Sequence, residues 1–359
     1  MKNSFKFLLI AFAAILLFTS CEKDTPGTDV TFEQKVLIIN QGNFTEHSAS
    51  LSLFDEKTMT ITNRIYETAN SGISIGATII SGTVSPQKEA YLVCNNPDKI
   101  DIVDAATGKL KSSITNSLAS PRNMIFAGDK LFVTNWDYNY EVNDLGWWEY
   151  PDSYIAVYDA VSKALVKRIP AGTDAEGIAM FGTRLFVAVK EGVRVFDASR
   201  EDYPVIATIR PSGVTGNAKH LVFDSSYKLW ASFPDKGLVR IDPSSLVADK
   251  VVDMPVDSMD GFITSDGKGK KIYTYKTEYD SNYNPTGASI FSMDVANFSI
   301  SEVFTGTYFY GVGVSPSTGN IFTAETSFSS NSLLKVAGPD GILKTSAGAG
   351  IGTSRYLFF

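Results

Sequence analysis

Charged side chains recur at one position of a repeated segment, and they are the residues of this chain best suited to chemistry. The position directly precedes a recurrent small residue, and it holds Gly76, Arg122, Glu176, Lys219, Asp260, Tyr310 and Arg355. If the repeats surround an axis, these residues form a mixed ring of charge at the mouth of a channel. Such a ring predicts hydrogen-bonding groups for a polar ligand. The alternative is a ring of ion pairs that satisfy one another around a water-filled channel.

Aromatic residues are concentrated in one segment, residues 135–152. Its sequence, NWDYNYEVNDLGWWEYPD, contains Trp136, Tyr138, Tyr140, Trp147, Trp148 and Tyr150. Exposed apolar groups in such number usually mark a binding site. The alternative is that the segment folds back and caps its own repeat.

Further aromatic residues lie in other segments that interrupt the repeat. The next longest insertion, residues 276–289, adds Tyr279 and Tyr283, and shorter ones add Phe44, His47 and Phe328. Together these segments predict an aromatic-walled bowl suited to a sizeable, partly flat ligand.

Signals for catalysis or metal binding are weak. Neither of the two histidines, His47 and His220, belongs to an HExxH, HxH or Cys/His pattern. The basic residues of the charged ring would repel a divalent ion, so a carboxylate-bound metal on the axis is not expected. We therefore predict a binding protein without cofactor or resident metal and not an enzyme, with a lactonase-like hydrolase as the alternative. Cys94, in the apolar run YLVCN, is predicted to be a small buried hydrophobe rather than a nucleophile.

A repeat of about 46 residues must position these side chains. Each copy joins a small-residue apolar segment, an apolar run and an alternating stretch that usually ends in Asp. The alternating stretches are LSLFD (51–55), IDIVD (100–104), IAVYD (155–159), VRVFD (193–197), LVRID (238–242), IFSMD (290–294) and a degenerate LLKVAGPD (333–340). Each predicts a strand followed by a turn that favours Asp. Because such units bury their apolar faces only against neighbours, we predict an all-β, seven-bladed β-propeller.

The C-terminal segment is predicted to close the ring. Six small-residue segments precede their apolar runs, whereas the seventh, TSRYLFF (353–359), lies at the other end of the chain and resembles PRNMIF (121–126). It would supply the inner strand of the first blade, whose other strands begin near Val36, and would leave no open sheet edge. We therefore expect one domain over residues 35–359.

The N-terminal residues predict export and a lipid anchor. Lys2 and Lys6 precede an apolar stretch, residues 7–18, that is too short to span a membrane and suits a secretory signal. Small residues then lead to Cys21, which resembles the bacterial lipoprotein box with Leu17 displaced by one position. We predict a signal peptide at 1–20, acylation at Cys21 and a flexible tether at 21–34. An ordinary cleaved signal with an incidental cysteine is the alternative.

The charge balance excludes some partners. Removing residues 1–20 takes away two lysines and no acids, which leaves 30 basic and 39 acidic residues and a net charge of −9. We therefore expect no nucleic-acid partner, and membrane contact only through the N-terminal lipid. Lys23, with its acidic neighbours, weakly resembles a surface-export signal, so we expect a lipid-anchored protein on the surface of the outer membrane.

Several motifs resemble one family over residues 36–359. INQGNF followed by SLSLFD, SPRNMIF with LFVTNWD, and YFYGVGVSPSTGNIFTAE resemble the YncE-like surface-layer propellers, particularly the DUF5074-type lipoproteins of gut anaerobes. Members of the BtuG type capture cobalamin and pass it to a TonB-dependent transporter. The resemblance implies a nutrient-binding lipoprotein, with cobalamin or another corrinoid ahead of a glycan or a haem. A scaffold whose aromatic segment docks on an outer-membrane transporter is the second function class.

Overall fold

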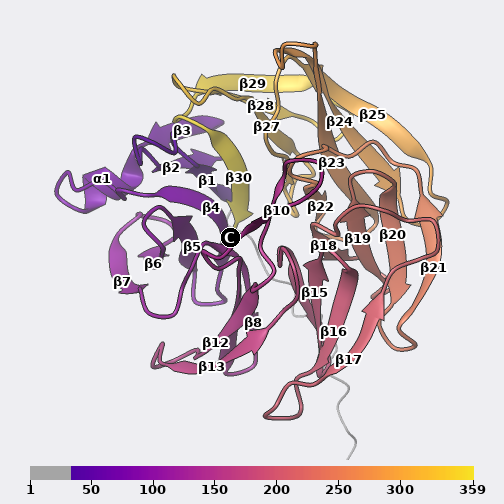
Figure 1. Ribbon diagram of the computed structural model, residues 1–359. Helices are drawn as coiled ribbons and strands as arrows, with labels where there is room; N and C mark the ends of the chain where they lie inside the picture. Colours follow the sequence, from indigo (N-terminus) through magenta and orange to yellow (C-terminus); the bar gives the residue numbers. More distant parts are fainter. Residues whose placement is uncertain (1–33) are drawn as a thin grey trace, which may run out of the picture. The chain divides into compact units, whose positions relative to one another are not determined.

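The computed structural model describes residues 34–359, which form seven four-stranded antiparallel sheets and one short hairpin. The sheets surround a central axis, and the yellow C-terminal strand β30 lies beside the indigo strand β1 (Figure 1). The predicted seven-bladed β-propeller is thus confirmed. The predicted signal peptide, Cys21 and all of the tether except Gln34 lie outside the described residues.

The first three blades contain the longest connections. From inner to outer, blade one consists of β30 (Thr353–Phe358), β1 (Lys35–Asn40), β2 (Ser50–Asp55) and β3 (Thr60–Asn63). Blade two consists of β4 (Thr78–Val84), β5 (Glu89–Asn95), β6 (Lys99–Asp104) and β7 (Leu110–Ile114). Blade three consists of β8 (Pro121–Ala127), β9 (Lys130–Asn135), β12 (Tyr154–Asp159) and β13 (Leu165–Pro170). Helix α1 (Ile65–Ala69) links the first two blades. The hairpin of β10 (Glu141–Val142) and β11 (Trp148–Glu149) lies in the connection from β9 to β12.

Blades four to seven are continuous in sequence. Blade four consists of β14 (Ile178–Phe181), β15 (Arg184–Val189), β16 (Gly192–Asp197) and β17 (Val205–Ile209), and blade five of β18 (Leu221–Phe223), β19 (Leu229–Phe233), β20 (Gly237–Asp242) and β21 (Val247–Val252). Blade six consists of β22 (Ile263–Ser265), β23 (Lys271–Tyr279), β24 (Pro285–Asp294) and β25 (Ile300–Gly306), and blade seven of β26 (Gly313–Val314), β27 (Ile321–Glu325), β28 (Leu333–Ala337) and β29 (Leu343–Gly348). Over residues 34–359 no helix is both long and apolar enough to cross a membrane.

The recurrent Asp ends the third strand of a blade because its side chain builds the next turn. Asp55 Oδ1 accepts hydrogen bonds from the backbone N–H groups of Lys57 (2.9 Å) and Thr58 (3.1 Å). Asp242 does the same with Ser244 (2.8 Å) and Ser245 (2.9 Å). The carboxylate thus satisfies two backbone donors in a tight turn. The repeated Asp is a structural residue of the repeat.

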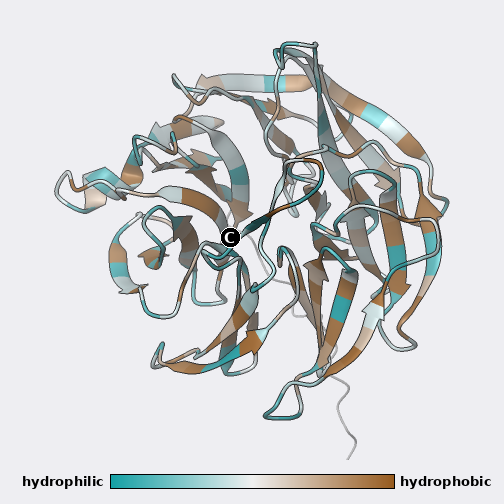
Figure 2. Ribbon diagram, viewed as in Figure 1, coloured by the Kyte–Doolittle hydropathy of each residue, from teal (hydrophilic) through white to brown (hydrophobic). Residues whose placement is uncertain are grey.

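The hydrophobic core lies between neighbouring blades. Leu37 of β1 and Leu92 of β5 belong to one buried cluster, and Tyr91 of the same strand β5 packs with residues of blade three in the next. Hydrophobic residues accordingly concentrate in the strands, while the loops are mostly hydrophilic (Figure 2). Cys94 is fully buried in the first cluster, and burial raises the pKa of its thiol. This agrees with the predicted hydrophobic role of Cys94.

A buried carboxylate fastens blade one to blade seven. The side chain of Glu56, next to the end of β2, accepts hydrogen bonds from Ser315 Oγ (2.7 Å), Thr318 Oγ1 (2.5 Å) and Asn320 Nδ2 (2.8 Å). These donors lie in the turn between β26 and β27. The contact therefore reinforces the closure that β30 makes.

Replacing Glu56 with alanine is expected to lower the free energy of unfolding by about 1–3 kcal/mol, because three donors lose their acceptor in a buried site. Urea unfolding measures the change. Glu46→Ala, in an exposed loop, is the control and should leave the curve unchanged. Equal unfolding curves for wild type and Glu56→Ala would show that the contact of Glu56 with the β26–β27 turn does not stabilise the protein.

Candidate functional site: a pocket above blade two

A pocket of about 640 Å³ opens on the loop face beside the axis. It is lined by Gln41, Phe44, Ile80, Asn95, Asn96, Pro97, Asp98, Ser120, Arg122, Trp136, Tyr138, Tyr150, Asp260, Tyr310 and Arg355. Seven of the predicted site residues are among them. The structure thus brings together four of the seven residues of the charged ring and three of the six aromatic residues of segment 135–152.

The pocket lies over blade two because that blade contributes little bulk there. The connection from β5 to β6 is short, whereas the corresponding connection of blade three runs from Trp136 to Ser153. The inner strand β4 adds only the apolar Ile80 to the lining. On its two sides, β30 and β8 carry Arg355 and Arg122.

The prediction that Gly76 is the blade-two member of the charged ring is wrong. Thr78 pairs with Asn95 in blade two as Pro121 pairs with Asn135 in blade three, so Ile79 and Ile80 match Arg122 and Asn123. Gly76 lies in the loop before β4. Register irregularities after Ile79 and after Pro121 are β-bulges that the sequence pattern does not reveal.

One wall of the pocket is an ion-pair group centred on Glu176. Arg122 donates from Nε and Nη2 to the two oxygens of Glu176, each at 3.1 Å, and Lys219 Nζ lies 3.7 Å from Glu176 Oε1. Burial opposes ionisation of Glu176, but the charges of Arg122 and Lys219 outweigh it and hold the pKa of Glu176 below its usual value. Glu176 and Lys219 support this wall from behind and do not line the pocket.

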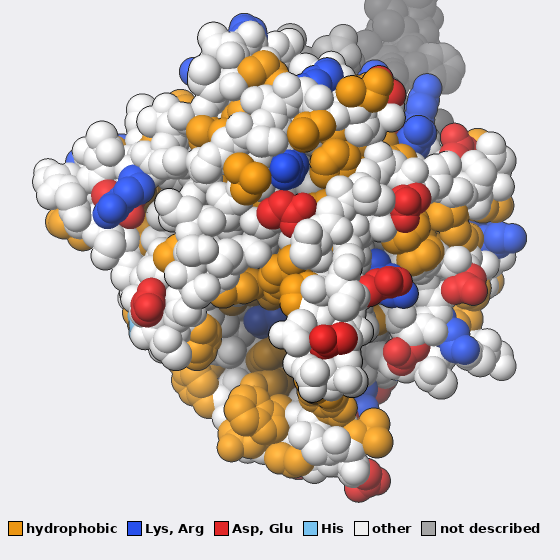
Figure 3. Space-filling model, turned by 90° about the horizontal axis from the view of Figure 1, so that it is seen from above, with side chains coloured by type: hydrophobic (Ala, Val, Ile, Leu, Met, Phe, Trp, Pro, Cys, Tyr) orange, Lys and Arg blue, Asp and Glu red, His pale blue; other side chains and the backbone are white. Residues whose placement is uncertain are grey.

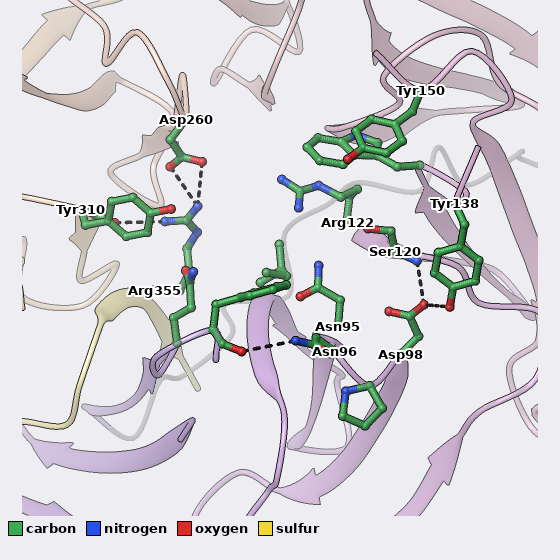
Figure 4. Close-up of a pocket in the computed structure, with 15 residues that line it drawn as sticks. Asn95, Asn96, Asp98, Ser120, Arg122, Tyr138, Tyr150, Asp260, Tyr310 and Arg355 are labelled. Atoms are coloured by element: carbon green, nitrogen blue, oxygen red, sulfur yellow. Dashed lines mark hydrogen bonds and ion pairs between the residues drawn. The ribbon is translucent and has the colours of Figure 1, made fainter. Parts of the chain in front are cut away.

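The opposite wall is a second group, centred on Asp260. Arg355 Nη2 donates to both oxygens of Asp260 (3.1 and 2.9 Å), and His220 Nε2 lies 3.7 Å from Oδ1. Tyr275 also donates to Asp260 (3.1 Å). Burial again opposes ionisation, but the charge of Arg355 and the contact with His220 hold the pKa of Asp260 well below its usual value. Figure 4 shows Asp260, Arg355 and Tyr310 together on this side.

The charged ring is built from ion pairs, and its role in binding a polar ligand stays a prediction. Its members pair with one another, as the ion-pair alternative predicts. Four of them, Arg122, Asp260, Tyr310 and Arg355, nevertheless line the pocket.

The aromatic segment contributes a stack of planar groups. The rings of Trp136 and Tyr150 lie 4.6 Å apart at an interplanar angle of 15°, and the guanidinium carbon of Arg122 lies 3.8 Å from the centre of Trp136. Both faces of Trp136 are therefore covered. Its Nε1 is buried without a hydrogen-bond partner.

A third wall joins the aromatic segment to blade two. The hydroxyl of Tyr138 donates to Asp98, which also accepts a hydrogen bond from the backbone N–H of Ser120 (2.8 Å). The hydrogen bond to Asp98 raises the pKa of Tyr138 to about 12. The loop of blade three is therefore bridged to the short loop of blade two (Figure 4).

The remaining predicted aromatic residues lie outside the pocket. Tyr140 contacts Trp148 at a ring distance of 5.2 Å on the β10–β11 hairpin. Trp147 and Trp148 are 67% and 64% exposed. Tyr279 packs against Tyr308 beyond the pocket, and Tyr283 is 85% exposed. The aromatic segment thus both lines the pocket and presents rings to solvent, and it is not a simple cap on its own blade.

Several polar lining residues were missed from the sequence. Asn95 is the last residue of β5, and Gln41, Asn96 and Asp98 lie just after the second strands of blades one and two; polar residues are common at such strand ends and turns and carry no functional signal of their own. Asn95 is the most informative of them, because it is buried and its Oδ1 has no hydrogen-bond partner. Within residues 34–359, no three His, Cys, Asp or Glu side chains are placed to hold a metal ion.

The family model described as "Domain of unknown function (DUF5074)" matches residues 34–336. The chain belongs to the DUF5074 family. No curated protein matches this DUF5074 chain in sequence.

Solved structures resemble the DUF5074 propeller at low sequence identity. A protein from Bacteroides fragilis NCTC 9343, provisionally named a 6-phosphogluconolactonase, is 14% identical with a TM-score of 0.64, over 93% of this chain and 99% of that one. Hydrazine synthase of Kuenenia stuttgartiensis is 15% identical (TM-score 0.60; 77% and 88%), and apo AztD of Citrobacter koseri is 10% identical (TM-score 0.58; 90% and 97%). At these identities the similarity establishes the fold.

Proposed function

We propose that this protein is a lipid-anchored capture protein of the outer membrane that binds a nutrient, with cobalamin or another corrinoid as the first candidate, and delivers it to a TonB-dependent transporter. The observation that carries the proposal is the pocket above blade two. It offers about 640 Å³ on the loop face, with charged, amide and aromatic groups converging from several blades. A corrinoid is named first because the motifs resemble those of the family that includes BtuG-type lipoproteins, although the motifs are specific for the family rather than for a ligand.

Titration calorimetry with cyanocobalamin, cobinamide, haemin and a panel of oligosaccharides tests the ligand. Binding heat with only the two corrinoids supports the proposal. Binding heat with only haemin or an oligosaccharide would show that the protein captures a different ligand. The lactonase-like alternative rests on the name of one structural neighbour. Lactone hydrolysis by the purified protein would favour it.

A docking scaffold is the second candidate, and the exposed rings of Trp147 and Trp148 favour it. They lie outside the pocket, on the β10–β11 hairpin of blade three. Figure 3 shows hydrophobic side chains reaching the surface in groups between separated charged ones. Surface aromatics of this kind often anchor a partner protein.

Alanine substitutions separate the two candidates. Trp136→Ala is expected to weaken ligand binding by about 1–4 kcal/mol, because it removes the ring that supports Arg122, whereas Trp147→Ala and Trp148→Ala should leave ligand binding near that of the wild type. Calorimetry measures ligand binding by the three variants. Co-purification of an outer-membrane transporter measures whether Trp147→Ala and Trp148→Ala weaken docking. Binding of no ligand, together with a transporter contact that requires Trp147 and Trp148, would favour the scaffold.

The anchor is tested separately. Mass spectrometry of the native protein is expected to find a diacylglyceryl group on Cys21, and Cys21→Ala should release the protein from the membrane fraction. A soluble wild-type protein whose mature chain begins elsewhere would contradict the lipid anchor. It would not affect the proposal that the pocket binds a ligand.

A further inference from the structure

Arg122 offers the pocket a flat face. Its Nε and Nη2 atoms donate to Glu176, each at 3.1 Å, so one edge of the guanidinium is occupied. One face lies on Trp136, 3.8 Å from the ring centre. Arg122 still lines the pocket, and what remains for a ligand is the other face and Nη1.

Arg355 repeats this arrangement from the other side. Its Nη2 donates to Asp260, and its Nη1 donates to the carbonyl oxygens of Tyr310 (3.3 Å) and Ser354 (3.2 Å). Its guanidinium carbon lies 4.3 Å from the centre of Phe262. Both arginines are therefore backed by an aromatic ring and paired with a buried carboxylate.

The two guanidinium groups flank the apolar strand of blade two. Figure 4 shows Arg355 and Arg122 apart from each other across the pocket, with Asn95 on the same side as Arg122. Because Glu176 and Asp260 compensate their charges, attraction for a free anion is weak, and contact between planar groups is the main interaction left to them. Guanidinium groups stack well on flat π systems.

We infer that the ligand is gripped through a flat, conjugated ring system that lies against the guanidinium faces of Arg122 and Arg355 and carries a polar substituent for Asn95. Asn95 Oδ1 is buried and lacks a partner, so it would accept a hydrogen bond from that substituent. The inference deepens the proposed function and rests on the same pocket. It names planarity, rather than charge or size, as the property that selects the ligand.

The experiment compares two fragments of similar outline. 2-Naphthamide is flat and conjugated, and decahydronaphthalene-2-carboxamide carries the same amide on a puckered saturated ring. Ligand-observed NMR on the full chain should show 2-naphthamide binding at least about 10-fold more tightly, the scale of a stacked cationic contact. Equal affinities would overturn the inference, and this comparison needs no variant.

Lysine substitutions then separate planarity from charge. Arg122→Lys and Arg355→Lys keep the positive charge beside Glu176 and Asp260 but remove the flat group. Each substitution should weaken the binding of 2-naphthamide by about 5- to 10-fold and leave the affinity for the saturated fragment unchanged. Arg200→Lys, on an exposed turn, is the matched control. Unchanged 2-naphthamide binding in both pocket variants would reject the two arginines as the binding faces.

The two proposals can fail independently. Corrinoid binding that is unaffected by Arg122→Lys and Arg355→Lys would reject the inference and keep the proposed function. Selective binding of 2-naphthamide without any corrinoid binding would keep the inference and reject the corrinoid. A melting temperature near that of the wild type shows that a variant is folded, so that its binding data can be interpreted.

Discussion

Deletion of residues 353–359 is expected to abolish the cooperative unfolding transition of the propeller. The deletion removes β30, which pairs with β1 from Val36↔Phe358 to Asn40↔Thr353. It also removes Tyr356 and Phe359, which lie in two different hydrophobic clusters. Each buried aromatic side chain contributes about 1.5–3 kcal/mol. Together with the lost strand pairing, the total approaches the whole stability of a typical domain, about 5–15 kcal/mol.

Circular dichroism and thermal unfolding test this expectation. The matched control deletes seven residues, 142–148, from the exposed hairpin of blade three. Glu141 and Glu149 pair across that hairpin, so the chain can be rejoined there with little strain. The control should unfold cooperatively. A truncated protein that melts like the wild type would show that closure through β30 is not needed.

Arg355→Ala is expected to lower the free energy of unfolding by about 3–5 kcal/mol at neutral pH, because it leaves Asp260 as a buried charge without its main partner. The position of these arginines in the charged ring alone, interpreted as ion pairs at a water-filled channel, predicts that Arg122→Ala and Arg355→Ala leave stability nearly unchanged. The side chains of Arg355 and Asp260 are only 11% and 14% exposed, and this burial reverses that expectation. Chemical denaturation at pH 7 measures the loss.

The effect of Arg355→Ala should depend on pH in a defined direction. In the wild type the pKa of folded Asp260 is lowered, so its stabilising contribution is fully present above the unfolded value of about 3.9 and is lost as the pH falls through the folded value. Without Arg355, burial favours the protonated form of Asp260. The difference in stability between wild type and variant is therefore expected to be smaller at pH 3 than at pH 7.

An exposed pair provides the control for both measurements. Arg200 and Asp202 form a similar two-bond contact, at 3.0 Å for each bond, but both side chains are 60% exposed. Solvent screens such a pair, so Arg200→Ala should not change stability measurably at either pH. A loss for Arg200→Ala equal to that for Arg355→Ala would remove burial as the explanation.

The repeat predicted the fold well because strand spacing, turn residues and closure all follow from local patterns. VRVFD at 193–197 lies within β16, and TSRYLFF at 353–359 contains β30. The degenerate LLKVAGPD was harder to interpret, and only Leu333–Ala337 of it forms strand. Such patterns are local, and strands a few residues long express them directly.

The pocket could be predicted only in part, since its residues meet through the ring rather than through the sequence. Arg122 and Trp136 stood out by charge and by aromatic clustering. Asn95 and Asp98 did not, because polar turn residues occur after strands throughout the chain. Which aromatic rings face the pocket and which face solvent depends on how the blade-three loop crosses to Asp98, and no local pattern specifies that crossing.

The hydrogen bond between Thr353 and Asn40 joins residues 313 positions apart, and it has a consequence for biosynthesis. A ribosome that has completed six blades has still not made the strand that covers the inner edge of β1. Until residues 353–358 emerge, that edge remains open for pairing with other chains. Contacts over such a sequence separation also form slowly. Chains that lack residues 353–358, for example after late ribosome stalling, should therefore aggregate rather than form a shortened propeller.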